Sequence, residues 1–377
     1  MKKLIFKKII KDIFYFFLLI SLSITLIVWV IQAVNFLDIV SEDGHGFDIY
    51  FKYTLLHVPK IFNKIFLFIF FISVFYIILK FENNNELLIF WTNGIKRNSF
   101  IKVIIIYSFI FMIVQMLFSS FLVPQSQNKA REFIRVSKIE LFSALIKEKK
   151  FIDTVSNLTI FIEDKKTDGT LTRIFLKEDF QENKSQIIYA SSGELKTYTN
   201  NKTYLKLYNG KVINTDKGKI NTFSFTETEI DLSRYKTKTT TNPKLQELKS
   251  KYLIDCLISI NANKEHLFET QYFQCEKNNF SEIARELFRR LYVPIYIPLL
   301  GLIASLLIFK SKDSFNYNFF KNSIFIFGVL TIVSSELTVR YFGSNFINNI
   351  FLILLPLIIF LIIILWLLSN SNYVKNK

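Results

Sequence analysis

The chain contains six long apolar stretches, at about residues 13–34, 61–79, 103–123, 291–309, 322–339 and 350–368. An α-helix rises about 1.5 Å per residue, so about 20 apolar residues cross a hydrocarbon layer of roughly 30 Å. The fifth stretch is the weakest of the six because it contains Glu336. One such stretch could be a buried helix of a soluble protein, but the set predicts an α-helical membrane protein with six transmembrane helices, arranged three and three.

An insert with a different pattern, residues 124–290, separates the third and fourth stretches. Apolar and polar residues alternate over much of 151–235, as they do in half-buried strands. The alternating segments are 158–162, 173–177, 186–190, 195–199, 204–208 and 222–226, with turn signals at 167–170, Ser192-Gly193, Asn209-Gly210 and Lys217-Gly218. Six to eight short antiparallel strands of this kind predict a sandwich or jelly roll. Residues 128–150 and 242–260 have helical character and are expected to connect the β-domain to the membrane.

The interior of this β-domain has two interpretations. It could be an ordinary aliphatic core closed by packing, or it could remain open to hold an apolar ligand. Alternation specifies which residues point inward but not how tightly the opposite side covers them. The pattern by itself leaves both interpretations open.

Basic residues are concentrated in alternate loops of the predicted membrane part. Lysines and arginines lie at positions 2, 3, 7, 8 and 11, at 80, 96, 97 and 102, at 310, 312 and 321, and at 375 and 377. The loop after the first stretch instead carries Asp38, Glu42, Asp43 and Asp48. Short loops rich in Lys and Arg stay on the cytoplasmic side. Both termini are therefore predicted to be cytoplasmic and the β-domain to lie on the opposite side.

The formal net charge of +16 does not by itself indicate nucleic-acid binding. The Lys residues border apolar stretches, where they set membrane orientation, and no basic stripe coincides with a reading motif. Three scattered histidines give little support to a metal centre, and no nucleotide-binding or hydrolase motif is present. We therefore expect no cofactor and no enzymatic activity, with energy supplied by a partner. Cys256 and Cys275 could form a disulfide or remain unpaired.

A predicted cytoplasmic loop, residues 83–97, contains a short helix with large apolar residues. An Asn at the helix start and Glu86 in the first turn favour initiation, and Gly94 favours termination. Leu87, Phe90 and Trp91 lie between them. Such a helix could lie on the membrane surface, or it could dock into a groove of a cytoplasmic protein, and the pattern supports both equally.

At this loop the sequence resembles the LptF/LptG permease family, whose members carry a segment of the form S-E-L-x-x-x-R-A-x-G-I/L. The matching residues are Glu86-Leu87 and Gly94-Ile95, whereas Asn85 replaces the family's Ser and no basic residue occupies its Arg position. Further matches are Pro124 after the third stretch, residues 192–195 and 207–210 in the insert, and the approach to the fourth stretch at 284–294. Together they cover nearly the whole chain in the family's order.

The resemblance, which is closer to LptF, implies a bacterial inner-membrane ABC transporter subunit that extracts lipopolysaccharide and passes it to a periplasmic jellyroll bridge. It implies an LptG-like second permease, a dimeric LptB-like cytoplasmic ATPase docked through Glu86, Leu87, Phe90, Trp91 and Gly94, and LptC- and LptA-like bridge proteins. The candidates for a lipid-holding β-domain interior are Ile160, Ile162, Leu205, Leu207, Phe223 and Phe225. The candidates for headgroup contacts are Gln32, Asn35, Lys52, Lys60 and Lys64.

Two pairs of opposite charge occur at helical spacing near the fourth and fifth stretches. Glu286 and Arg290 are expected to pair on a helix surface, and the same spacing of Glu336 and Arg340 would make the buried glutamate tolerable. Two other classes of function fit the same architecture. One is a membrane scaffold or sensor whose β-domain binds proteins, and the other is a different ABC permease, such as the lipoprotein-release type.

Overall fold

The computed structural model describes residues 2–37, 47–136, 148–155, 157–166, 169–181, 184–197, 203–216, 219–232, 244–261, 275, 279–343 and 346–375. The chain forms two compact units. The first comprises Met1–Val30, His57–Gln127 and Lys244–Lys377, and the second comprises Ile31–Leu56 and Asn128–Pro243. Three acidic residues of the predicted loop after the first apolar stretch, Asp38, Glu42 and Asp43, lie outside the described residues.

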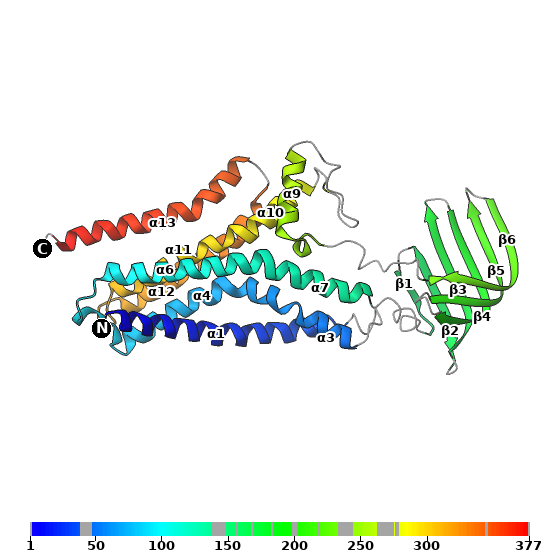
Figure 1. Cartoon of the computed structure of the whole chain (residues 1–377), viewed down its shortest axis with the longest axis horizontal. Helices are drawn as coiled ribbons and strands as arrows, with labels where there is room; N and C mark the ends of the chain where they lie inside the picture. The colour runs from blue at the N-terminus through cyan, green and yellow to red at the C-terminus, as the bar shows by residue number, and fades with distance from the viewer. Residues whose placement is uncertain are drawn as a thin grey trace. The chain divides into compact units, whose positions relative to one another are not determined.

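The first unit is built from long apolar helices (Figure 1). Its helices are α1 (Lys2–Asn35, which continues into the second unit), α4 (Val58–Asn83), α5 (Glu86–Thr92), α6 (Arg97–Leu117), α9 (Ser250–Asn261), α10 (Phe280–Leu291), α11 (Tyr296–Ser305), α12 (Tyr317–Tyr341) and α13 (Phe346–Lys375). A π-helix, η1 (Phe118–Leu122), joins α6 to α7 (Val123–Val136), and short 3₁₀ turns follow at η3 (Leu245–Glu247), η6 (Val293–Ile295) and η7 (Leu306–Phe309).

Five helical stretches of the described chain are long and apolar enough to cross a membrane. They are Leu4–Asn35, Phe47–Asn83, Arg97–Ile134, Phe280–Phe309 and Tyr317–Tyr341, and a sixth apolar segment, Asn349–Leu365, is shorter. A six-stranded β-sheet is inserted between the third and fourth of these stretches. The predicted fold class, a helical membrane protein with an inserted β-domain, is confirmed.

Helix α11 is the centre of the bundle, because all ten of its residues are buried. Its close approach to α6 depends on Gly301, where a Cβ atom would overlap the side chain of Ser108. On α12, a Cβ atom at Gly328 would likewise overlap the ring of Phe71 on α4. Small residues at such crossings let membrane helices pack at short distance. The outer helices α1 and α13 expose leucine and isoleucine side chains that suit contact with lipid.

The β-sheet of the second unit consists of β1 (Phe151–Val155), β2 (Leu158–Lys165), β3 (Thr170–Gln181), β4 (Lys184–Thr197), β5 (Thr203–Asp216) and β6 (Lys219–Asp231). Neighbouring strands follow one another in the chain, and every pair is antiparallel. The described strands therefore form a single curved meander, rather than the two-sheet sandwich or the jelly-roll topology expected from the sequence (Figure 1).

Two of the predicted turns are in fact the interiors of long strands. Ser192-Gly193 lies within β4 and Asn209-Gly210 within β5. Glycine is required at both places because atoms of neighbouring strands lie too close for a Cβ atom. A Cβ at Gly193 would meet Ile174 and Lys206 O, and one at Gly210 would overlap Tyr189 O and the Phe225 ring. A glycine in an otherwise regular strand marks this kind of approach as well as a turn. Residues 167 and 168 of the turn predicted at 167–170, and both residues of the turn predicted at 217–218, lie outside the described residues.

These glycines lie beside a kink that crosses the sheet. The cross-strand pairing omits Glu163, Arg173, Ser191 and Asn209, and both Arg173 (φ 48°) and Asn209 (φ 49°) have positive φ. Ser191 Oγ donates to the carbonyl oxygens of Tyr208 and Asn209 along this line. The inward-facing residues switch from odd to even positions across the kink on β5, from Leu205 and Leu207 to Gly210 and Val212. One apolar face therefore continues around the bend.

Candidate functional site

Helix α5 connects α4 to α6 and has two different apolar faces. Leu87 and Phe90 are buried in the bundle, where the Phe90 ring contacts those of Phe6, Phe81 and Phe100. On the other face, Leu88 is 57% exposed and Ile89 is 50% exposed. Leu87 and Phe90, which the sequence indicated as docking contacts, thus anchor the helix to the bundle. The sequence analysis missed Leu88 and Ile89 because four consecutive apolar residues conceal which ones face outward.

The ends of α5 are formed by backbone geometry. Asn85 adopts a left-handed conformation (φ 61°) and makes no side-chain capping bond, contrary to the predicted Asn cap. Gly94 also has positive φ (67°), and the Ile95 N–H donates to Phe90 O at 3.0 Å. A left-handed glycine followed by this long-range bond is the usual way of closing a helix at its C-terminus. Arg97 lies over the Trp91 ring at 5.9 Å, next to this end.

The Glu86 carboxylate is already engaged within the chain. Lys8 on α1 donates to Glu86 Oε2 at 2.6 Å, and the Asn84 amide lies 3.3 Å from Oε1. The hydrogen bond from Lys8 is the main reason that the pKa of Glu86 is lowered from its ordinary value. The predicted docking carboxylate therefore also joins α5 to the start of α1, a connection that no sequence pattern indicated.

The candidate lipid-holding residues of the β-sheet differ in how far their side chains are buried. Ile160, Ile162, Leu205 and Leu207 are all buried in one aliphatic cluster. Phe225 is partly buried against this cluster, whereas Phe223 is 60% exposed. Cross-strand pairing through Val212 places Phe223 in the same row as buried residues of β3 and β4. The apolar interior is thus packed at its centre and opens toward β6.

The five headgroup candidates are divided between the two units. Gln32 is half-buried and Asn35 is exposed, both at the end of α1 that belongs to the second unit. Lys52, on α3 (Phe47–Leu55) of the same unit, pairs with Asp48 at 2.6 Å and lies over the Phe133 ring. Lys60 and Lys64 belong to the first unit and line a polar cavity of about 450 Å³.

This cavity lies at the end of the bundle opposite α5. It is lined by the first three turns of α4, the end of α6 with η1 and the start of α7, η3, α10 with η6, and the last turns of α12. Its polar lining residues are Lys60, Asn63, Lys64, Gln115, Ser119, Gln246, Glu286, Arg289, Arg290, Ser335 and Glu336. The expected pair between Glu336 and Arg340 is not among the ion pairs of the described residues. Glu336 is exposed rather than buried as expected, and its side chain lines the cavity.

Arg290 is the most extensively bonded side chain of the cavity wall. Its Nε lies 3.0 Å from Glu286 Oε1, so the predicted pair exists, but Arg290 is only 3% exposed and the pair is buried rather than on the helix surface. The guanidinium also donates to three carbonyl oxygens of the segment that returns from the β-sheet, those of Leu245, Gln246 and Leu248, and to Ser250 Oγ. These additional acceptors supply the hydrogen bonds that make a buried charge tolerable.

Two helix irregularities face each other at Arg290. The α-helical partner of the Arg290 carbonyl would be the N–H of residue 294, which is absent because that residue is proline, and Ser119 Oγ of η1 donates to this carbonyl at 2.8 Å instead. In return, Ser250 Oγ donates to the carbonyl of Ser120 in the π-helix at 2.8 Å. Side chains of η1 and α9 thereby satisfy backbone carbonyl groups at the two helix irregularities.

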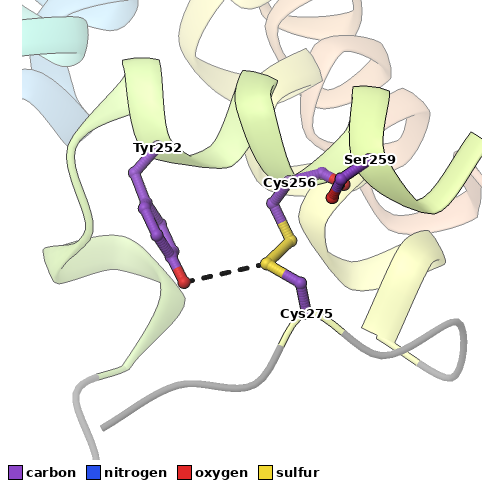
Figure 2. Close-up of a disulfide and its surroundings, with 4 residues drawn as sticks. All are labelled: Tyr252, Cys256, Ser259 and Cys275. Carbon is purple, nitrogen blue, oxygen red and sulfur yellow. Dashed lines mark hydrogen bonds between the residues drawn. A yellow bond between two sulfur atoms is a disulfide. The ribbon is translucent and has the colours of Figure 1, made fainter. Parts of the chain in front are cut away.

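A disulfide links Cys256 on α9 to Cys275, which decides between the two alternatives left by the sequence (Figure 2). Figure 2 shows Tyr252 directed at this bond, with its hydroxyl 3.7 Å from Cys275 Sγ. Both sulfurs are buried in a small cluster with Leu253 and Ile283. The bond therefore holds the segment before α10 against α9.

Comparison with known proteins places the whole arrangement in one family. The family model "Lipopolysaccharide export system permease LptF/LptG" matches residues 7–370, which include both the helices and the inserted sheet. A protein of Rickettsia prowazekii (strain Madrid E), described as "Uncharacterized protein RP871", is 25% identical over 195 residues. That alignment covers 52% of this chain and 54% of the relative, so it spans about half the length of each. The chain belongs to the LptF/LptG family of lipopolysaccharide export permeases.

Proposed function

We propose that this chain is the permease subunit of an ABC transporter that extracts lipopolysaccharide from the bacterial inner membrane and delivers it to a periplasmic bridge. The observation that carries the proposal is the family match over both the helices and the β-sheet. The chain would pair with an LptG-like permease and use a dimeric LptB-like ATPase. LptC- and LptA-like proteins would continue the path toward the outer membrane.

The proposed orientation has both termini in the cytoplasm and the β-sheet in the periplasm. It is supported at the α5 end of the bundle by basic residues, including Lys8, Lys96 and Arg97. At the opposite end it is supported by the Cys256–Cys275 disulfide, since such bonds persist in oxidising compartments such as the periplasm.

The ATPase would dock on the exposed face of α5. Leu88 and Ile89 offer an exposed apolar contact, and Glu86 lies beside them in sequence with one carboxylate oxygen bound to Lys8. Leu87, Phe90 and Gly94 support this surface from the inside, because they anchor and terminate the helix. Trp91 is half-buried and stacks with Arg97 at the edge of the surface.

The lipid would contact the chain at two places. Acyl chains would enter the apolar interior of the sheet from the β6 side, where Phe223 and Phe225 lead to Leu205, Leu207, Ile160 and Ile162. Each buried CH₂ contributes about 0.8 kcal/mol, so short lengths of acyl chain suffice for transient binding. Lys60 and Lys64 would contact phosphate groups from the polar cavity of the first unit. Lys52, Gln32 and Asn35 are separate headgroup candidates within the second unit.

Copurification in detergent tests the proposal. The tagged chain should bring with it an ATPase and a second permease of the same plan. Leu88→Glu should reduce ATPase recovery at least about tenfold, because it places a charge in an apolar contact, and should leave thermal stability unchanged because Leu88 is exposed. The matched variant Leu87→Ala should instead lower stability by about 2–4 kcal/mol. Recovery of the chain without an ATPase, or equal ATPase recovery with Leu88→Glu, would contradict the proposal.

A further inference from the structure

The polar cavity holds charges that the described chain does not neutralise. Four basic and two acidic side chains line it, which leaves a formal charge of +2. Glu286 is shared by Arg290 at 3.0 Å and Arg289 at 3.6 Å. Lys60 and Lys64 make no ion pair or hydrogen bond with a described residue, although Lys60 is half-buried. Lys60 is the more enclosed of the two lysines and Lys64 is exposed, so the cavity presents cationic side chains that can bind an anion.

The same cavity also holds hydrogen-bond acceptors that have no donor. Gln115 is only 3% exposed, and its Oε1 has no partner in the described structure. Asn63 Oδ1, on α4 between the two lysines, is likewise buried and unpartnered. The Glu336 side chain, which is exposed, lines the cavity from α12 and forms no ion pair with a described residue. Buried polar groups nearly always have a partner, so the buried oxygens of Gln115 and Asn63 point to a missing donor.

Lys60 and Lys64 are one helical turn apart, and Asn63 lies between them in sequence on the same helix. Gln115 comes from the end of α6 and Glu336 from the last turns of α12. The cavity therefore presents cations together with acceptors in a volume of about 450 Å³. A simple anion would satisfy the lysines and leave the acceptors without donors. A ligand that carries both a phosphate and neighbouring donors would satisfy both sets.

We propose that this cavity binds a lipid headgroup in which hydrogen-bond donors lie next to a phosphate. Lys60 and Lys64 bind the phosphate, as in the proposed function on which this inference rests, while Gln115, Asn63 and Glu336 accept the donors and determine headgroup selectivity. Ethanolamine phosphate supplies such donors through its ammonium group, and a phosphorylated glucosamine supplies them through its hydroxyl and amide groups. A choline phosphate has the same charges as ethanolamine phosphate but no N–H donor.

Native mass spectrometry of the purified full-length chain, titrated with lipids of matched acyl chains, tests the proposal. Phosphatidylethanolamine should bind about tenfold more tightly than phosphatidylcholine, the ratio expected of one charge-assisted hydrogen bond. Gln115→Leu should reduce that ratio to about twofold or less and leave phosphatidylcholine affinity unchanged. Gln125→Leu is the matched control, because Gln125 is exposed and does not line the cavity. Thermal unfolding establishes that both variants fold.

The two parts of the proposal fail separately. Lys60→Gln with Lys64→Gln should weaken every phosphate lipid, and an unchanged affinity would remove the phosphate contact assumed in the proposed function. Equal affinities for the ethanolamine and choline lipids, or a preference that survives Gln115→Leu, would overturn the selectivity role and indicate a cavity filled by water. Competition with lipid A identifies the source: displacement of phosphatidylethanolamine by lipid A favours the glucosamine phosphate, and retention favours the phospholipid.

Discussion

At the scale of single residues, Glu86 has a bond that its local sequence does not indicate. Its place in the first turn of a short helix led us to predict a docking carboxylate, and in the structure Lys8, near the N-terminus, binds it. The sequence separation is 78 residues, and no local pattern encodes such a contact. The proposed docking of an ATPase at Glu86 would therefore have to accommodate or replace the bond to Lys8.

The ion pair between Lys8 and Glu86 should stabilise the chain in a pH-dependent way. The pKa of Glu86 lies below its ordinary value of 4.5 in the folded chain, so its stabilising contribution is present above that value and is lost as the pH falls through the folded pKa. A double-mutant cycle of Lys8→Gln and Glu86→Gln should give a coupling of about 0.5 kcal/mol at pH 7, typical of a partly exposed pair.

Thermal unfolding in detergent at pH 7 and again at a pH below the folded pKa of Glu86, reached by lowering the pH stepwise from 4.5, measures this coupling. The coupling should shrink toward zero at the lower pH, because the protonated carboxyl no longer pairs with the ammonium group. A coupling of equal size at both pH values would show that the pair has no electrostatic role. A coupling of zero at pH 7 would show that the pair does not form in solution.

At the scale of elements, the packing of neighbouring segments decides where strands end and which side chains are buried. The sequence located the alternating segments of the sheet, but it divided β4 and β5 at glycines that are needed for close packing at a kink. Similarly, Glu286 and Arg290 have the spacing of a surface pair, yet α9, η3 and η1 cover them in the folded chain. The two turn predictions and the predicted surface location of the pair were therefore wrong, because each depends on the distant segments that pack against these residues.

Arg290 should be far less tolerant of substitution than its neighbour Arg289. Arg290→Lys keeps the charge but loses the forked guanidinium that reaches Leu245, Gln246 and Leu248, so stability should fall by about 2–4 kcal/mol. Arg289→Lys, at a half-exposed position on the same helix, should change stability by about 0.5 kcal/mol or less. Chemical denaturation in detergent measures both. Equal effects would mean that Arg290 acts only as a charge.

At the scale of the whole molecule, the inserted sheet and the disulfide both lie within the residues that match the family. The family match extends over helices on both sides of the sheet, so the insert is part of the family's architecture rather than an addition. The disulfide closes the returning segment at the entrance to α10. That position is consistent with an oxidising compartment on this side of the bundle.

The chain should carry no free thiol in cells with an oxidising periplasm. Cys256 and Cys275 are the two cysteines of the sequence, so a maleimide–polyethylene glycol assay on denatured protein reports on this bond alone. We expect no adduct before reduction and two adducts after it. Cells that lack periplasmic disulfide formation should yield two adducts without reductant. Two adducts from normal cells would contradict the proposed orientation.

The sequence by itself determined the membrane helices, the inserted sheet and the family, because these depend on hydropathy, on the period of alternation and on motif order. Only the tertiary structure decided that Leu88 rather than Leu87 faces outward, that Gly210 lies in a strand, and that Arg290 is buried. It also brought Lys60, Gln115 and Glu336 into one cavity. Local patterns fix which conformation a segment adopts, whereas burial, kinks and shared cavities depend on which distant segments pack against it.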